Sequence, residues 1–289
     1  MAWVRHAVVT HAASVDPDLG WASPELARMA EVHGVDVLWD GTLPPGPPEE
    51  NDGVRLADAR RVVEGIPANL RWVASLPRKE PRDVLLALGG GDGSTVSLAD
   101  VAAGSRVGVT SLRARGLLAL NRPDLIPVMT DPDLDRATLT GDAGVDLLVL
   151  PAHRVRKSGW TGHAAEVLPG KSWMPAPGQG GIVVLSRDEG HAVTDPWAAM
   201  HDPMSHHALS AEASFMQALG AGPGSPVCAW ALPFGRWIRL WAMVLDPEGL
   251  RAVRADLTGA LDDPGSLGER MASLMKLRGA SALLASVGT

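Results

Sequence analysis

The segment RVGVTSLRARGLLALN, residues 106–121, carries the pattern on which the predicted fold rests. Its first part, 106–110, is apolar and β-branched, which is typical of a buried strand. From Ser111 to about Asn121 the spacing of apolar residues favours a helix. A strand that leads directly into a helix is the repeating unit of an α/β domain.

The same alternation continues after this segment. Strands are predicted over 125–129 and 145–150, with a helix from Asp131 between them. Together with 106–121 they predict one complete α/β unit.

The chain before this segment has a similar pattern. Strands are predicted at four apolar stretches, residues 4–10, 35–39, 70–76 and 84–88. Ser23-Pro24-Glu25 has the composition of a helix start, and residues 56–64 have helical character. The order strand, helix, strand over residues 4–39 predicts parallel pairing. Four prolines and three acids in 41–53 predict a surface loop.

The last third of the chain has a different pattern. Its predicted elements are a helix over 208–219, strands over 228–232, 237–245 and 250–257, and a helix over 266–278. Consecutive strands joined by the turn Asp246-Pro247-Glu248-Gly249 predict an antiparallel sheet that the last helix covers. The predicted fold class is α/β, with two α/β domains and a small α+β C-terminal domain.

Two glycine-rich segments indicate the domain boundaries. GGGDGS, residues 89–94, has the composition of a linker, and PAPGQGG, residues 175–181, leads into an apolar strand over 182–185. The chain is therefore expected to return to its first domain after residue 180. The expected domains are 1–94 with 181–203, then 95–180, then 204–289.

Composition excludes several classes of protein. The 289 residues are 46% hydrophobic and 20% charged, which is ordinary for a globular chain. The net charge of -7 argues against a nucleic-acid partner, and no apolar run is long enough to suggest a membrane segment. A single cysteine cannot form an intramolecular disulfide, so we expect a cytoplasmic protein.

Few residues suggest chemistry by themselves. Thr110, Ser111, Arg113 and Arg115 at a helix start are typical of an anion site, although a serine cap with exposed arginines explains them equally well. The histidines at 201, 206 and 207 lack a recognised ligand spacing, so no metal site is expected. Cys228, between apolar neighbours, has the context of a buried residue, with a chemical role as the lesser alternative.

The chain from about Ile66 to Asp263 resembles the hydroxymethylbilane synthase family, also called porphobilinogen deaminase. VGVTSLRARGLL at 107–118 is similar to the family's VGTSSLRRQ segment, and PAPGQG at 175–180 and Ala211-Glu212 follow in the family's order. The resemblance implies two domains of the type II periplasmic-binding-protein kind around a cleft, and a third domain with the cofactor loop. It also implies a monomeric transferase of tetrapyrrole biosynthesis.

In that family a loop cysteine holds a dipyrromethane primer, and an aspartate assists ammonia loss from porphobilinogen. This chain departs from the family at both positions. The aspartate falls on Arg61, so Asp58, one helical turn earlier, is the acid that we nominate beside it. The cysteine falls on Pro223, so no covalent dipyrromethane is expected, and a cofactor role for Cys228 would need a shifted loop.

The family's arginines bind the acetate and propionate groups of the substrate. Arg113 and Arg136 match such positions, Arg60 falls on a lysine of the family and His11 on an arginine. The predicted substrate-binding residues are His11, Arg60, Thr110, Ser111, Arg113, Arg115, Arg136 and Gln179.

Three functions follow as hypotheses. The first is an enzyme of this fold that acts on a small anionic, pyrrole-like or aminomethyl-bearing molecule without covalent dipyrromethane, in a specialised pathway. The second is a non-catalytic module that binds a small anion. The third is an unaltered hydroxymethylbilane synthase with compensating residues.

Overall fold

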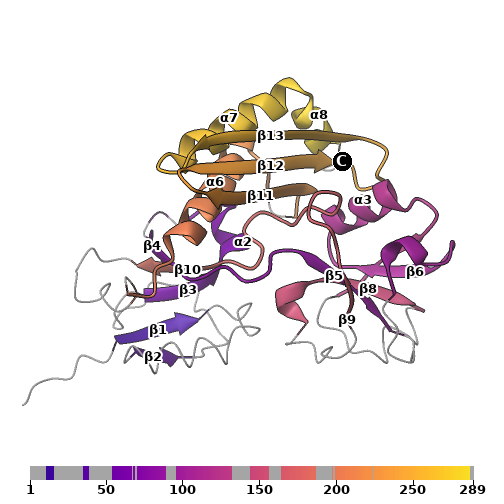
Figure 1. The fold of residues 1–289 in the computed structure, drawn as a ribbon, viewed down its shortest axis with the longest axis horizontal. Helices are drawn as coiled ribbons and strands as arrows, with labels where there is room; N and C mark the ends of the chain where they lie inside the picture. Colours follow the sequence, from indigo (N-terminus) through magenta and orange to yellow (C-terminus); the bar gives the residue numbers. More distant parts are fainter. Residues whose placement is uncertain are drawn as a thin grey trace, which may run out of the picture.

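In the computed structural model the described residues form three sheets, two of five strands and one of three. Figure 1 shows the two five-stranded sheets at either side of the lower half, with the three-stranded sheet and its helices above both. The residues that the structure describes are 11–15, 35–38, 54–66, 68, 70–88, 96–131, 144–155, 164–186, 197, 199–222 and 224–286.

The first sheet has the strand order β2-β1-β3-β10-β4. Its strands are β1 (His11–Val15), β2 (Val35–Leu38), β3 (Val54–Asp58), β4 (Arg71–Ser75) and β10 (Ile182–Ser186). Strand β1 is parallel to β2 and β3, whereas β10 is antiparallel to β3 and β4. The strand at 35–38 is paired in parallel, but its partner is the strand at 11–15, which was not among the predicted strands. The strand expected at 4–10 lies outside the described residues, as do the helix start at 23–25 and the loop at 41–53.

The helix predicted over 56–64 is wrong for its first part. Residues 54–58 form β3, and only α2 (Ala59–Val62) is helical. Strand β3 lies between β1 and β10, with Asp58 opposite Ile182, and Leu56 and Ala57 are buried. Pairing on both edges and burial on both faces outweigh a weak local helical preference.

The second sheet has the order β7-β6-β8-β5-β9. Its elements are β5 (Asp83–Ala87), β6 (Arg106–Val109), α3 (Leu112–Asn121), β7 (Ile126–Met129), β8 (Leu147–Pro151) and β9 (Ala164–Val167), with short 3-10 helices at Leu98–Asp100 and Ala152–Arg154. The strand and helix predicted over 106–121 are confirmed. The helix expected from Asp131 continues into residues outside the described ones.

One strand belongs to a different sheet from the one expected. β5 was placed with residues 1–94, but it pairs antiparallel with β8 and β9 of the second sheet. The chain therefore crosses between the sheets at 76–82, before the glycine-rich segment at 89–94. A strand as apolar as Val84–Leu86 fits the middle of either sheet, so composition could not decide its partner.

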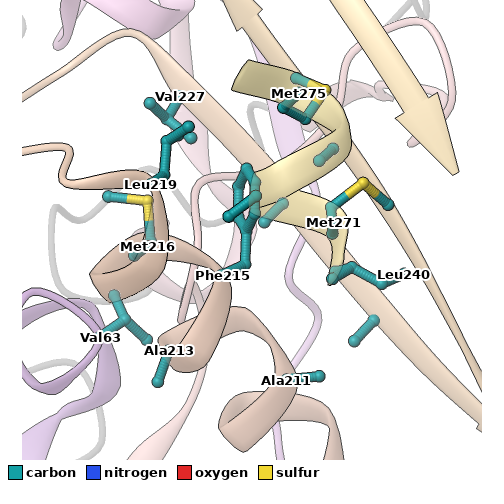
Figure 2. Packing of buried hydrophobic residues seen from close by; sticks show 14 of the residues in the cluster. Val63, Ala211, Ala213, Phe215, Met216, Leu219, Val227, Leu240, Met271 and Met275 are labelled. Carbon is teal, nitrogen blue, oxygen red and sulfur yellow. The ribbon is translucent and has the colours of Figure 1, made fainter. Parts of the chain in front are cut away.

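The third sheet is antiparallel, in the order β11-β12-β13, as predicted. Its elements are α6 (Pro203–Leu219), β11 (Val227–Phe234), β12 (Trp237–Leu245), β13 (Ala252–Ala260), α7 (Pro264–Leu277) and α8 (Ala280–Ala285). Figure 2 shows the core between this sheet and its helices, where Phe215 of α6 lies near Met271 of α7. Val63, which follows α2, belongs to the same core, so the first unit is anchored to the third.

The other face of the third sheet packs on the second unit. Cys228, Met243 and Leu245 share a core with Leu117 of α3. The contact is close at Gly116, where an added Cβ would lie 2.4 Å from Leu245 Cδ1. The architecture confirms the predicted class. Two α/β units each contain a sheet in which one strand runs antiparallel to the others, and an α+β unit contacts both. Among the described residues no helix is long and apolar enough to span a bilayer.

Candidate functional site

A cavity of about 170 Å³ lies where the three units meet. Its walls come from α2, the start of α3, the turn at 176–177, the end of α6 and the loop before β11. The polar residues of this central cavity are Arg60, Glu64, Ser111, Arg113 and Ser225. The structure thus brings together three of the predicted substrate-binding residues, Arg60, Ser111 and Arg113.

Asp58 ends β3 and caps α2. Its Oδ1 accepts a hydrogen bond from the backbone N–H of Arg60 at 2.9 Å, and its Oδ2 accepts one from Arg60 Nη2 at 2.8 Å. The Asp58 side chain is 1% exposed and is not among the residues that line the central cavity. The structure therefore gives Asp58 the role of orienting Arg60, which does not support the predicted role as the reacting acid.

Arg113 lies in a buried polar network. Its Nη2 donates to Asp83 Oδ2 at 2.7 Å, and its Nη1 donates to the carbonyl oxygen of Met174 at 2.7 Å. Trp173 Nε1 also donates to Asp83 Oδ2, and Gln179 Nε2 donates to Asp83 Oδ1. A carboxylate that accepts three hydrogen bonds holds the guanidinium in one orientation.

The Nε–H group of Arg113 takes no part in this network. Its Nε is buried and has no hydrogen-bond partner among the described residues, although Arg113 lines the central cavity. A buried donor without a partner costs about 1–3 kcal/mol, so it is a favourable place for an acceptor on a ligand. Ser111, next to it in the cavity wall, caps α3 by accepting a hydrogen bond from Ala114 N–H at 3.2 Å.

Glu64 is the acid of the central cavity, and the sequence analysis missed it. The Glu64 side chain is exposed to solvent on one side, and its partial burial raises the pKa of the carboxyl above the ordinary value of 4.5, while Arg60, Arg61 and the Gly224 backbone oppose the rise. Glu64 lies four residues after Arg60, so in the helix predicted over 56–64 the two side chains would share one face, and this spacing could have indicated Glu64.

Gly178 allows the PAPGQG turn to pack closely against the backbone of α2. Its φ is +76°, and an added Cβ would lie 2.7 Å from the backbone N of Arg60. Both the left-handed backbone and the close contact require glycine at this position. The turn is thereby held against the wall of the cavity that carries Arg60.

Several predicted site residues lie elsewhere. Arg115 pairs with Glu248 at the surface, its Nη2 2.7 Å from Glu248 Oε1. Gln179 is buried and bonded to Asp83, so it supports the Arg113 network and does not face the cavity. Arg61 is exposed and Thr110 half-buried, and neither lines the cavity.

The two other predicted substrate-binding residues are His11 and Arg136. Val15 of β1 lies opposite Leu56 of β3, and the two strands are parallel. His11 is four residues before Val15 and Asp58 two residues after Leu56, so the two positions are six residues apart along the strands, about 20 Å. The backbone of His11 lies at the start of β1, at the opposite end of the first sheet from α2, and its role in binding a substrate stays a prediction. Arg136 and Pro223 lie outside the described residues.

Cys228 is a core residue. It is fully buried in β11 opposite Met243, and burial raises the pKa of its thiol to about 12. It is not among the residues that line the central cavity. The interpretation as a buried small hydrophobe is the one that the geometry supports.

Cys228 is therefore expected to resist alkylation. At pH 8 a thiol with a pKa near 12 is ionised to roughly one part in 10⁴, and only the thiolate reacts. Native protein treated with iodoacetamide should show no mass increase, whereas protein in denaturant should gain one carbamidomethyl group. Rapid modification of the native protein would show that Cys228 is accessible and would reopen a chemical role for it.

The three histidines near the start of α6 lie close to one another. His206 Nδ1 is 3.1 Å from Ser75 Oγ, and its ring centre is 5.2 Å from that of His201. Burial, with smaller effects of His201 and His207, lowers the pKa of His206 to about 4. Among the described residues no group of three or more His, Cys, Asp or Glu side chains is arranged to hold a metal ion.

Comparison with known proteins gives consistent relatives. Residues 60–195 match the family described as "Porphobilinogen deaminase, dipyromethane cofactor binding domain". The porphobilinogen deaminase of Thermus thermophilus is 30% identical over 218 residues, 74% of this chain and 71% of that protein. The corresponding protein of Roseiflexus castenholzii is 32% identical over 78% of this chain and 73% of its own length.

The match to the porphobilinogen deaminase of Acidothermus cellulolyticus is 33% identical over 73% of this chain and spans 64% of that protein. Among solved structures, the ligand-binding component of an ABC-type import system from Staphylococcus aureus matches 71% of this chain and 72% of its own, at 12% identity and a TM-score of 0.38.

Proposed function

The chain belongs to the porphobilinogen deaminase family, and from that membership we propose that it removes ammonia from a small, single-ring molecule that carries an aminomethyl group and a carboxylate. The observation that supports this function best is the central cavity, which combines a glutamate with an arginine N–H that has no acceptor in the described part of the chain.

The size of the central cavity favours one ring. Its volume is about 170 Å³, whereas pockets for drug-sized ligands measure about 300–1,000 Å³. An engineered cavity of about 150 Å³ holds benzene. A single substituted pyrrole fits this scale better than a chain of rings.

The charges of the cavity favour a zwitterionic ligand. The guanidinium groups of Arg60 and Arg113 already pair with Asp58 and Asp83, so their positive charges are largely compensated. Arg113 Nε can still donate to a carboxylate oxygen of the ligand. Glu64 can pair with a protonated aminomethyl group at the other end of the molecule.

The residues of this chain do not fit the cofactor that the family description names. Covalent attachment requires an accessible thiol, and Cys228, the only cysteine, is fully buried outside the cavity lining. Position 223, where the family resemblance places the thiol, is proline. The reaction proposed for this chain therefore involves no dipyrromethane.

The proposed reaction needs only an acid–base group and a bound substrate. The bond between the methylene carbon and the protonated nitrogen breaks, ammonia leaves with the bonding pair, and the ring becomes an azafulvenium cation. The Glu64 carboxylate stabilises this cation. Water then adds to the methylene carbon, and Glu64 accepts the proton that the water loses.

A binding module is the second candidate, and one observation favours it. The position of the family aspartate is held by Arg61, a cation that would oppose a cationic intermediate. A protein that closes around an anion needs its arginines and no acid.

Incubation with porphobilinogen separates these functions. We expect ammonia release and no increase in the intact mass of the protein. If porphobilinogen is not consumed but raises the melting temperature, the binding function replaces the proposed one. If the purified protein carries the extra mass of two linked rings, the proposal of an enzyme without a covalent primer is refuted.

A further inference from the structure

A second cavity, of about 280 Å³, lies at the junction of the second and third units. Lys171 and Met174 come from the second unit, and Trp241, Arg254, Asp256 and Arg278 from the third. We call it the basic cavity. None of its lining residues lines the central cavity, so the two are separate places in the fold.

The basic cavity has an excess of positive charge. Lys171, Arg254 and Arg278 each have no carboxylate within ion-pair distance among the described residues. The one acid of the lining, Asp256, is already paired with Arg239, whose Nη2 lies 2.6 Å from Asp256 Oδ2. Three cations therefore surround a hollow in a protein whose net charge is -7.

The walls of the basic cavity are held in place. The ring of Trp241 lies 5.9 Å from that of Trp230, and the guanidinium carbon of Arg239 is 4.9 Å from the centre of the Trp241 ring. Arg278 Nη1 donates to the carbonyl oxygen of Arg254 at 2.7 Å. This bond fixes Arg278 beside β13 and leaves its Nη2 and Nε for another acceptor.

We propose that the basic cavity binds a small oxyanion with at least two negative charges, a polycarboxylate or a phosphate. Like charges around one hollow repel each other, and a multivalent anion removes that repulsion. Arginine side chains bind carboxylate and phosphate oxygens with charge-assisted hydrogen bonds. The Trp241 ring gives the site an apolar wall beside these donors.

A ligand in this cavity would connect two units. Lys171 follows β9 in the second unit, whereas Arg254 and Arg278 belong to the third. An anion that contacts both sides binds only when the units are docked, so it stabilises the folded protein in proportion to its concentration.

Titration with citrate and with inorganic phosphate at low ionic strength tests the proposal. We expect one of the two to bind the native protein and to raise its melting temperature, and the one that binds identifies the class of anion. Arg254→Glu should weaken that binding by about tenfold or more, because it replaces a donor by a repelling charge. The matched control Arg236→Glu makes the same charge change in the exposed β11–β12 turn and should leave binding unchanged.

Two results would overturn the proposal. One is that neither anion binds the native protein at millimolar concentration. The other is that Arg254→Glu and Arg236→Glu weaken binding equally, which would indicate general attraction to the surface. Lys171→Gln, in an exposed turn, provides a second variant should Arg254→Glu fail to fold, and it must also weaken binding. Ammonia release from porphobilinogen plays no part in these outcomes.

Discussion

Glu212→Ala is expected to lower the free energy of unfolding by about 3–5 kcal/mol, the cost of removing one partner of a buried ion pair. Glu212 is fully buried in α6 and pairs with Arg78, its Oε1 2.7 Å from Arg78 Nη1. It also accepts hydrogen bonds from the backbone N–H groups of Gly178 and Ala231, at 2.7 and 2.8 Å. Alanine would leave the Arg78 guanidinium and both N–H groups without their acceptor.

Glu212 connects the crossover between the sheets, the turn beside α2 and the edge strand β11, so its loss should also loosen the central cavity. Denaturant unfolding followed by tryptophan fluorescence measures the change in stability. The control is Glu248→Ala, which removes the surface partner of Arg115 and should cost no more than about 1 kcal/mol. Equal effects of the two variants would show that the buried network does not hold the units together.

Glu64→Gln is expected to lower the rate of ammonia release by about 10²- to 10⁴-fold, the usual contribution of a positioned acid–base group. An amide has nearly the shape of the carboxyl but cannot pair with the cationic intermediate or take up a proton. The measurement is the initial rate of ammonia release at saturating porphobilinogen. Glu248→Gln makes the same change away from the cavity and should keep the native rate.

The pH dependence gives an independent check on Glu64. The proposed reaction uses the carboxylate, and burial raises the pKa of Glu64 above 4.5, so the native rate should fall on acidification at a higher pH than an ordinary glutamate would give. A raised pKa also means that the fold favours neutral Glu64, and the stability it contributes is lost as pH rises through that pKa. Glu64→Gln should therefore not lower the melting temperature at pH 8. A native-like rate in this variant would exclude Glu64 from the reaction.

Local pattern was sufficient for the elements that are regular in sequence. The strand and helix of 106–121, the strand at 182–186 and the hairpin that turns at 246–249 were predicted close to their observed bounds, because apolar periodicity and turn residues are local signals. Arg60, Ser111 and Arg113, three of the predicted substrate-binding residues, line one cavity, and their role in binding a substrate stays a prediction.

Pairing between side chains could not be predicted in the same way. Asp58 looks like a free acid in the sequence, but folding places it on Arg60 and buries it. Arg113 looks like a free cation, but Asp83, thirty positions earlier, compensates its charge. Whether a charged side chain can bind a ligand depends on the partner that the fold brings to it. Neither of these partners could be recognised from sequence spacing or composition.

The sequence by itself determined the fold class and the burial expected of Cys228, since both depend on residue type and local pattern. Only the tertiary structure decided which sheet receives the strand at 83–87, that Glu64 is the acid facing the central cavity, and that Lys171 meets Arg254 and Arg278. Those outcomes depend on close packing between the three units, which forms only after the chain has folded.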